Sequence, residues 1–399
     1  MLLAVVGPGV LAGLSDDDPA GITTYSILGA KYGYELLWVL ALSTVALIVF
    51  HLLGARMGVV TRKGLMALVR ENYGPRGAGV ALAALLIANL GTLCAEFAGV
   101  AAAGELFHVS RYATVPIAGL GVSLLVLRGS FHRVEHVLLA LSTVFITYVV
   151  SGFLAHPDWG AAGRGLVVPS IPLTRDAVLI AVATLGTTLA PWGLAFIQSY
   201  AVDKRLRIDD LRFEGIDVIV GAVLTGVIGL FIVVACAATL HSNGVSINDS
   251  RDAAQALQPL AGSFASTLFA FGFLGAALLA TAIVPLSTAY SAAEAFGRRA
   301  DLNDSFAEAR LFYTVYGVVL VIAAAIVLIP GAPLVKILYL TQALNAVLLL
   351  AILPFMRRLA RDPAVMGAHI LSPRGRWVTA AALAMIAVSV GTLFVLTAF

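Results

Sequence analysis

The chain of 399 residues is 60% hydrophobic and only 12% charged, whereas soluble domains average about 25% charged residues. This composition excludes an ordinary soluble domain and is typical of a polytopic helical membrane protein. The net charge of +3 does not indicate a nucleic-acid partner, because the basic residues follow the expected membrane topology. Cys94 and Cys236 lie in apolar stretches and indicate neither a disulfide framework nor a thiolate metal site.

Apolar stretches long enough to cross a hydrocarbon core of roughly 30 Å recur along the chain, and each crossing takes about 20 helical residues. The first stretch has no basic n-region and no cleavage site, so we expect it to be a retained span. We predict eleven spans, near residues 1–32, 34–57, 79–107, 112–127, 134–154, 176–202, 218–240, 261–295, 311–329, 334–356 and 377–396.

The basic residues are unevenly distributed between the two sets of connections. Of the 25 Lys and Arg residues, 19 lie in connections that follow even-numbered spans. Because cytoplasmic loops carry the excess of basic residues, these connections and the N-terminus are expected to be cytoplasmic. The chain is therefore predicted to be an integral protein of a bacterial inner membrane. Its expected partners are the lipid bilayer and a small solute, and a monomer would suffice.

Three consecutive carboxylates, Asp16 to Asp18, precede Pro19 and Gly21 within the first apolar stretch. An acid at membrane depth is costly unless it pairs, lines a water-filled cavity or binds a cation. Pro19 lacks a backbone N–H and Gly21 relaxes the backbone, so the helix should break here and free peptide carbonyls. We predict that Asp18 is the anionic ligand of a divalent cation. Asp16 and Asp17 are expected to form a vestibule or relay. The alternative is that all three aspartates only cap the second half-helix or lie in interfacial water.

A second break is predicted in the sixth span, where Pro191 leaves the carbonyl of Thr187 without its helical partner. A freed carbonyl can coordinate a cation. The two breaks occupy matching places in the two halves of the chain, and paired interrupted helices point to a transporter binding site near the bilayer midplane. This pattern predicts two inverted five-span repeats, over 1–155 and 176–360, separated by an extracellular loop at 156–175 and followed by an eleventh span within 361–399.

Further polar residues lie at membrane depth. Gln342 and Asn345 share one face of the tenth span, where they either line the site or make interhelical hydrogen bonds. Glu96 is the deepest additional acid and a candidate proton or ion relay. One string, from His132 to His136, matches the H-x-x-E-H pattern of inverzincin proteases. It has no evident third ligand, so we interpret it as an interfacial patch and expect neither an enzyme nor a cofactor.

At its two breaks the chain resembles the Nramp family of divalent-metal transporters. The Asp-Pro-Gly-Asn signature of the first span corresponds to Asp18-Pro19-Ala20-Gly21 here, so the acid is kept and the asparagine is not. In the sixth span the methionine and histidine of the family are replaced by Ala190 and Trp192. Glu96 and Gln342 match the family's glutamate of span three and glutamine of span ten.

The pattern is closest to the Nramp-related magnesium transporters, which it resembles at Gly21, in the Ala-Pro-Trp that begins at Ala190, and in the polar residues that run from Gln198 to Lys204. The resemblance implies a LeuT-like 5+5 inverted repeat with broken helices 1 and 6. Loss of the thioether removes a means of rejecting hard ions, and small residues leave room for the waters that Mg²⁺ retains. Gln198 joins the candidate relay residues.

The predicted function is alternating-access transport of a divalent cation, with Mg²⁺ the first candidate and Mn²⁺ the second, and with no proton coupling required. Asp18 would be the charged ligand, Thr187 a neutral oxygen donor and Gln342 a polar lining group, while Gly21 and Ala190 provide space. Two alternatives stay open: a proton-coupled Mn²⁺ or Fe²⁺ symporter, and a sodium-coupled transporter of an organic solute with the same fold.

Overall fold

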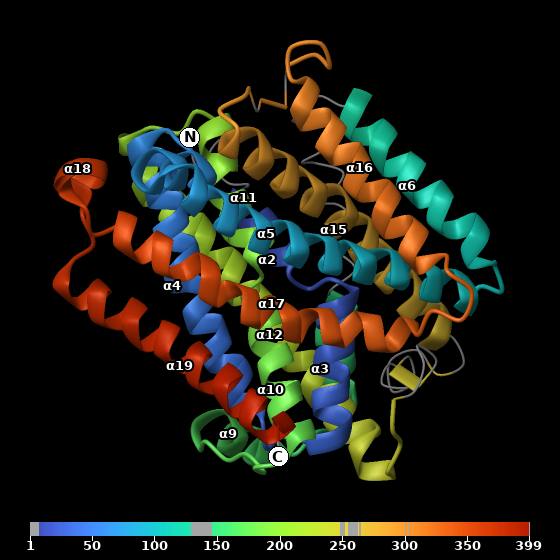
Figure 1. Cartoon of the computed structure of the whole chain (residues 1–399). Coiled ribbons are helices and arrows are strands. Elements are labelled where there is room, and N and C mark those ends of the chain that lie inside the picture. The colour runs from blue at the N-terminus through green and yellow to red at the C-terminus, as the bar shows by residue number, and fades with distance from the viewer. Residues whose placement is uncertain are drawn as a thin grey trace.

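A computed structural model of the protein describes residues 8–128, 146–247, 252–253, 262, 265–299, 301–302 and 304–398. Over these residues it is built from helices and contains no strand (Figure 1). The helices are α2 (Pro8–Ser15), α3 (Pro19–Tyr32), α4 (Leu37–Thr61), α5 (Leu65–Leu106), α6 (Arg111–Arg128), α8 (Ile146–Leu154), α9 (Trp159–Val167), α10 (Arg175–Thr188), α11 (Pro191–Asp203), α12 (Leu211–Thr239), α15 (Ala265–Ala295), α16 (Arg310–Val327), α17 (Leu334–Leu359), α18 (Pro363–Met366) and α19 (Pro373–Ala398).

The described helices fit a membrane protein of the predicted span order. Eight of them, with α10 and α11 counted together, are long and apolar enough to cross a bilayer. The pair α2 and α3, together with α6 and α8, takes the places of the remaining predicted spans. Large apolar side chains point outward, among them Ile117, Val321 and Val388, which are 69%, 70% and 68% exposed. Such exposure suits contact with lipid.

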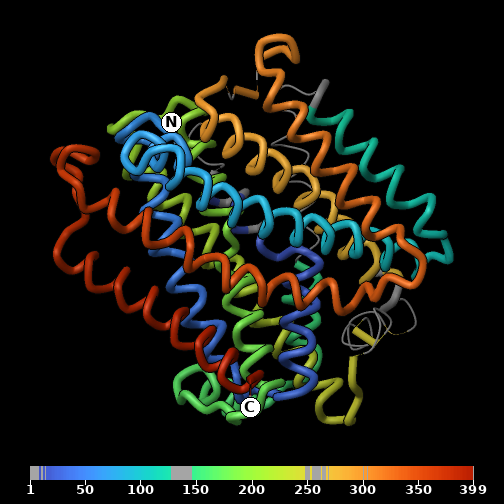
Figure 2. Tube along the Cα trace, viewed as in Figure 1, coloured from blue at the N-terminus to red at the C-terminus, as the bar shows by residue number. Residues whose placement is uncertain are grey.

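Both predicted helix breaks are confirmed. At the first break Asp18 has extended backbone angles (φ −71°, ψ 172°) and Pro19 opens α3. At the second break Ala190 has similar angles (φ −73°, ψ 139°) and Pro191 opens α11. Proline is favoured at the first position of a helix, because its fixed φ suits the helix and the missing N–H would be unpaired there. Figure 2 shows the chain turning from α2 into α3 near the middle of the molecule.

The first half-helix, α2, is fixed to α12. The backbone N–H of Gly9 donates to the Asp217 carboxylate over 2.6 Å, and the Thr225 hydroxyl donates to the carbonyl of Gly13. A β-carbon on Gly13 would overlap the backbone of Gly221, so the two helices touch through glycines. Small residues allow helix backbones this close approach in membranes. Polar and steric contacts therefore hold α2 along one face of α12.

The second half-helix, α3, is fixed to α10 at its outer end. The Lys31 ammonium lies 2.9 Å from the Asp176 carboxylate, and the Tyr32 hydroxyl donates to the same carboxylate over 2.8 Å. A β-carbon on Gly29 of α3 would overlap the Val233 carbonyl oxygen of α12, so α3 also packs on α12. Both halves of the first span thus lie against α12, and α3 has an additional link to α10 at its end.

Two segments differ from the predicted loops. The basic connection before the third span is largely helical, because α5 begins at Leu65 and kinks only at Gly74, whose φ of +71° is a glycine conformation. The predicted loop at 156–175 contains the helix α9. Asp158 caps α9 by accepting from the Ala161 N–H over 2.9 Å, which is the local reason that this glycine-rich segment is helical.

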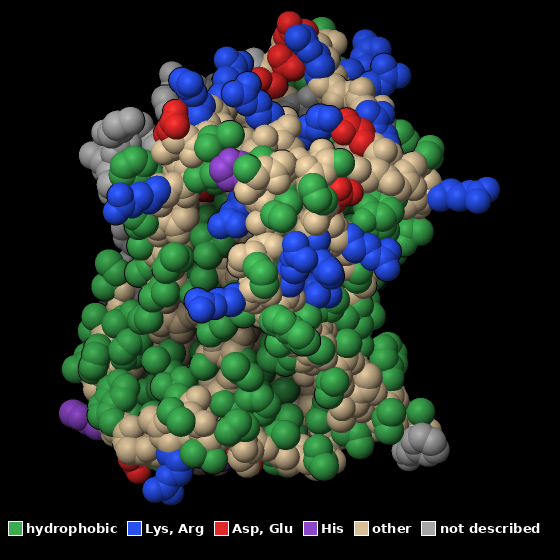
Figure 3. Space-filling view, turned by 90° about the vertical axis from the view of Figure 1, so that its left-hand side faces the viewer, with side chains coloured by type: hydrophobic (Ala, Val, Ile, Leu, Met, Phe, Trp, Pro, Cys, Tyr) green, Lys and Arg blue, Asp and Glu red, His purple; other side chains and the backbone are tan. Residues whose placement is uncertain are grey.

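The molecule has one strongly basic end. In Figure 3 the Lys and Arg side chains gather over the upper half of the visible face, whereas the lower half is mostly hydrophobic. Contributors to this end include the α4–α5 connection and the segment after α17, as the predicted topology requires. The final helix, α19, packs on α10 and α17 at the periphery, as an addition to the ten-span core would. The division into two inverted repeats stays a prediction.

Candidate cation site at two interrupted helices

Asp18 lies at the end of the first break with its carboxylate turned into the protein. The residue is 3% exposed, and its Oδ1 atom accepts from the backbone N–H of Gly21 over 2.6 Å. This is an N-cap, so the positive end of the α3 dipole favours the ionised carboxylate. The capping alternative raised from the sequence is therefore correct for Asp18 itself, and it also holds the carboxylate in one orientation.

Gly21 is the point at which the two breaks meet. A β-carbon built on it would lie 2.7 Å from the main-chain carbonyl oxygen of Asp16, 3.4 Å from Asp18 Oδ1 and 3.4 Å from Thr187 Oγ1. These are three oxygens of three chemical kinds, drawn from both interrupted helices. Oxygen donors in this mixture suit a hard divalent cation. Any side chain at Gly21 would displace at least one of them.

Thr187 is the contribution of the second break. It lies in the last turn of α10, where Pro191 cannot donate to its carbonyl, and it is 2% exposed. Its hydroxyl has no hydrogen-bond partner among the described residues. The sequence pointed to the carbonyl of Thr187, whereas the structure places the hydroxyl at the oxygen cluster. Both groups sit at the negative end of the α10 dipole, which favours a cation.

Tyr25 is a site residue that sequence reasoning missed. Its hydroxyl lies 2.8 Å from Thr188 Oγ1 and joins α3 to α10 directly beside the second break. The available signal was a tyrosine two turns after Asp18, beside Thr24 and Ser26, because a buried tyrosine hydroxyl usually has a partner. Its ring is fully buried.

Asp16 and Asp17 are enclosed, at 1% and 0% exposed, and do not form an open vestibule. None of their four carboxylate oxygens has a hydrogen-bond partner among the described residues. Buried ionised carboxylates without donors are strongly disfavoured, so these groups require a cation or a proton. A relay role for the two acids stays a prediction.

Glu96 lies on α5, next to the first break. It is fully buried, its carboxyl lies beside that of Asp18, and neither of its oxygens has a protein donor in the described part of the chain. A relay role for Glu96 stays a prediction. No group of three or more His, Cys, Asp or Glu side chains among the described residues is arranged to hold a metal ion, so uncharged oxygens must supply much of any coordination.

Gln342 and Asn345 form a hydrogen-bonded pair on α17. The Asn345 amide donates to Gln342 Oε1 over 2.9 Å and lies 2.9 Å from Thr92 Oγ1 on α5. A β-carbon on Gly186 would overlap the Gln342 carbonyl oxygen, so α17 touches α10 one residue before Thr187. Interhelical hydrogen bonding, the plainer alternative, is therefore present for Asn345. A lining role for Gln342 stays a prediction.

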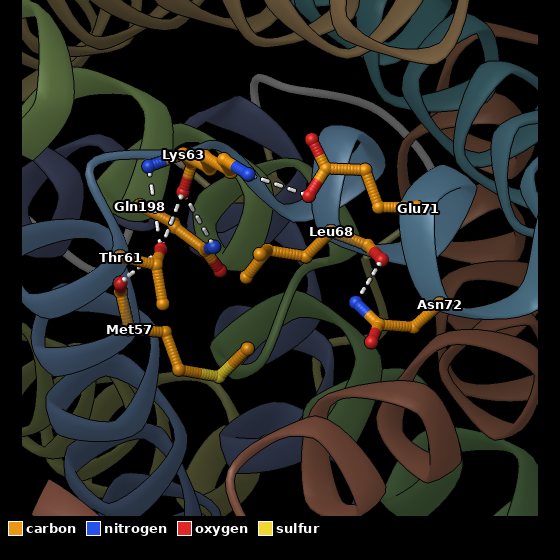
Figure 4. Close-up of polar contacts among 7 residues, drawn as sticks. All are labelled: Met57, Thr61, Lys63, Leu68, Glu71, Asn72 and Gln198. Carbon is orange, nitrogen blue, oxygen red and sulfur yellow. Dashed lines mark hydrogen bonds and ion pairs between the residues drawn. The ribbon is translucent and has the colours of Figure 1, made fainter. Parts of the chain in front are cut away.

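Gln198 and Ala190 belong to the half-helix α11 and to the break before it. The Gln198 amide donates to the Lys63 carbonyl over 2.9 Å and joins α11 to the α4–α5 connection (Figure 4). Gln198 therefore does not join Asp18 at the site, because it lies two turns along α11. Ala190 caps α11, and the next aromatic residue, Trp192, is fully buried. The H-x-x-E-H motif from His132 to His136 lies outside the described residues.

Interrupted helices that face each other across buried acids define an integral membrane protein with the LeuT-like transporter fold. The structure matches a crystal structure of the manganese transporter of Eremococcus coleocola with a TM-score of 0.79, at 20% identity, over 99% of this chain and 86% of the other. It also matches Mhp1, a nucleobase-cation-symport-1 family transporter, with a TM-score of 0.63, at 16% identity, over 98% of this chain and 90% of the other. These likenesses establish the fold.

The chain belongs to the Nramp family, described as natural resistance-associated macrophage protein-like, whose model matches residues 9–396. The divalent metal cation transporter MntH of Burkholderia ambifaria is 34% identical over 285 residues, which are 68% of this chain and 64% of the relative. The chain thus spans a little under two thirds of that relative. MntH of Bacillus subtilis is 31% identical over 299 residues, 72% of this chain and 69% of the relative. These relatives are transporters and not enzymes.

Proposed function

We propose that the protein carries a divalent cation across the membrane by alternating access, with the cation held between the two interrupted helices. The observation that carries the proposal is the convergence on Gly21 of oxygens from Asp16, Asp18 and Thr187. Asp18 supplies the charge, and the Thr187 hydroxyl and carbonyl with the Asp16 carbonyl supply neutral donors. The half-helices that carry these oxygens meet at this place. A tilt of one half-helix relative to the other would change the distances between the oxygens, and the cation could then be released to the other side of the membrane.

The donor set favours a hard cation. All the atoms at the cluster are oxygens, and the break of the sixth span offers Ala190 where a thioether would give preference to softer metals. Mg²⁺ gives up its waters reluctantly and is usually bound through one or two carboxylates with several waters kept. A site with one oriented carboxylate and small neighbours supports Mg²⁺ as a substrate, with Mn²⁺ also accepted. In this scheme Gln342 lines the site from α17.

Proton-coupled Mn²⁺ transport is the second candidate. The names of the MntH relatives and of the Eremococcus manganese transporter favour the ion, and the Glu96 carboxyl beside Asp18 favours the coupling. Against coupling, the histidine of the family's sixth span is Trp192 in this chain. The basic end is proposed to face the cytoplasm of a bacterial inner membrane, in which case the cation moves inward.

Flux into proteoliposomes tests the proposal. Purified protein is reconstituted, and Mg²⁺, Mn²⁺ and Ca²⁺ entry is followed with internal dyes, first without and then with a pH gradient. Asp18→Asn keeps the size of the side chain and the cap acceptor but removes the charge, and we expect flux to fall by at least about tenfold. The matched control is Asp209→Asn at an exposed aspartate of the α11–α12 connection.

The possible results separate the candidates. Saturable Mg²⁺ flux that depends on Asp18 and not on the pH gradient supports uncoupled Mg²⁺ transport. Mn²⁺ flux that carries protons, with Mg²⁺ excluded, supports proton-coupled Mn²⁺ transport instead. If no divalent ion enters and Asp18→Asn behaves like the parent, the cation proposal is wrong, and uptake of an organic solute driven by Na⁺ becomes the function to test.

A further inference from the structure

A histidine in the middle of α4 is buried without any partner. His51 is 1% exposed, and neither of its ring nitrogens has a hydrogen-bond partner among the described residues. Buried polar side chains are paired in the large majority of cases, so a group left unpaired needs a reason. The neutral imidazole is also the commonest nitrogen ligand for metals in proteins. Nothing in the proposed site at Gly21 uses His51.

His51 and Asp16 face the same place. A β-carbon built on Gly193, in the first turn of α11, would lie 3.2 Å from His51 Nε2 and 3.7 Å from Asp16 Oδ1. One imidazole nitrogen from α4 and one carboxylate oxygen from the first break therefore converge beside the second break. Both oxygens of the Asp16 carboxylate lack hydrogen-bond partners in the described part of the chain. A side chain at Gly193 would crowd both groups.

Asp16 links this place to the oxygen cluster at Gly21. Its main-chain carbonyl belongs to that cluster, whereas its carboxylate points to His51 and Gly193. Asp16 also lies on the α2 side of the break, and Gly193 lies in the first turn of α11, the half-helix that leads to Gln198 and the α4–α5 connection. The space between His51 and Asp16 is thus next to the oxygen cluster at Gly21, on the side that faces the basic end of the molecule.

We propose that Asp16 and His51 form a second position for the transported cation, one through which Mn²⁺ is accepted beside the Mg²⁺ that the oxygen cluster favours. This inference rests on the proposed function, because it assumes that a cation reaches Asp18. An imidazole nitrogen is a good ligand for first-row transition metals, whereas Mg²⁺ prefers oxygen. Two protein ligands leave the remaining coordination positions to waters.

Mn²⁺ serves as the probe, because its unpaired electrons report directly bound nitrogen. The full-length protein in detergent is saturated with Mn²⁺ and measured by electron spin-echo envelope modulation, once at natural abundance and once with ¹⁵N-labelled histidine. We expect a ¹⁴N imidazole signal that changes to ¹⁵N on labelling. It should persist in His241→Gln, whose exposed histidine follows the end of α12, and disappear in His51→Gln.

A second variant and a second readout guard against misfolding of His51→Gln. Gly193→Ala leaves the histidine in place but adds a methyl group between the two ligands, and it should also abolish the nitrogen signal. In proteoliposomes the ratio of Mn²⁺ to Mg²⁺ flux should fall by about tenfold or more in His51→Gln, the usual effect of disturbing a metal-binding group.

The outcomes distinguish this inference from the proposed function. Asp18-dependent flux, with bound Mn²⁺ that shows no histidine nitrogen in the parent protein, overturns the second position and leaves the function standing. A nitrogen signal that survives His51→Gln also overturns it, since another histidine is then the ligand. A parent protein that neither binds Mn²⁺ nor moves any divalent cation overturns both.

Discussion

The hydroxyl of Tyr25 donates to the hydroxyl of Thr188, and this bond joins the two interrupted helices. The oxygens are 2.8 Å apart, and the direction follows because Thr188 gives its own hydrogen to the Thr184 carbonyl, also over 2.8 Å. Tyr25 belongs to α3 and Thr188 is the last residue of α10. The bond therefore fixes the distance between the acid at one break and the free oxygens at the other.

Tyr25→Phe should remove this bond with little change in packing. We expect a loss of about 0.5–1 kcal/mol in stability, typical of an interhelical hydrogen bond in a membrane protein, and a clear fall in cation affinity because Thr187 is no longer held opposite Asp18. Thermal unfolding in detergent and the concentration dependence of flux measure the two effects. Tyr112→Phe, at a tyrosine 56% exposed, is the matched control. Equal behaviour of the two variants would contradict the role given to Tyr25.

Gly21→Ala should abolish most transport while leaving the fold intact. The added methyl group would lie 2.7 Å from the Asp16 carbonyl, so either this oxygen or α3 must move. We expect flux to fall by at least about tenfold, as when metal-site geometry is disturbed. Gly79→Ala is the control, because a β-carbon there meets nothing within 4 Å. A Gly21→Ala protein with parental flux would show that the cation binds elsewhere.

Glu294 should hold the basic end of the molecule closed. Its carboxylate accepts from the Ser199 hydroxyl of α11 over 2.5 Å and from the Met66 N–H at the start of α5 over 3.2 Å. Glu294→Gln keeps the size but removes one acceptor, and we expect it to cost about 1 kcal/mol or more. Hydrogen exchange should then accelerate in residues 65–69.

The control for Glu294 is Glu71→Gln. Glu71 pairs with Lys63 on the surface over 2.6 Å, and its side chain is 41% exposed (Figure 4). Exposed ion pairs contribute about 0–1 kcal/mol, so this variant should leave exchange at the start of α5 nearly unchanged. Faster exchange in Glu71→Gln than in Glu294→Gln would assign the closure to the surface pair instead.

Asp217→Ala should loosen α2 from α12. The Gly9 N–H would lose its 2.6 Å bond to a buried carboxylate, and an unpaired buried donor costs about 1–3 kcal/mol. We expect a lower unfolding temperature and easier proteolysis within the first 15 residues. The exposed Asp209→Ala is the comparison, and resistance to protease in both variants would contradict the anchoring role.

The sequence was sufficient to predict the two breaks and a carboxylate at the first of them, because proline chemistry and the cost of buried charge act locally. The ligand role of Asp18 stays a prediction. Pro19 and Pro191 each fix the first residue of a half-helix where predicted. The family, shown by the match over 9–396, was also recognisable from these motifs. Residue spacing along one helix likewise gave the shared face of Gln342 and Asn345, which the structure shows as a hydrogen bond.

The convergence of distant groups could not be predicted in the same way. The approach of Thr187 to Gly21 and of His51 to Asp16 depends on how four helices pack, and no spacing within one segment encodes that distance. Enclosure of Asp16 and Asp17 was missed for the same reason, because the covering residues come from other spans. The helix α9 was missed because its glycines outweighed the capping aspartate Asp158 in the sequence pattern.

The packing of both half-helices on α12 has a mechanical consequence for the acids between them. A β-carbon on Gly13 of α2 or on Gly29 of α3 would overlap the backbone of α12, so residues 16–18 form a non-helical joint whose two ends lie against the same helix. A tilt of α12 would therefore carry both half-helices and the three aspartates with it, and a cation held by these acids would move together with that helix.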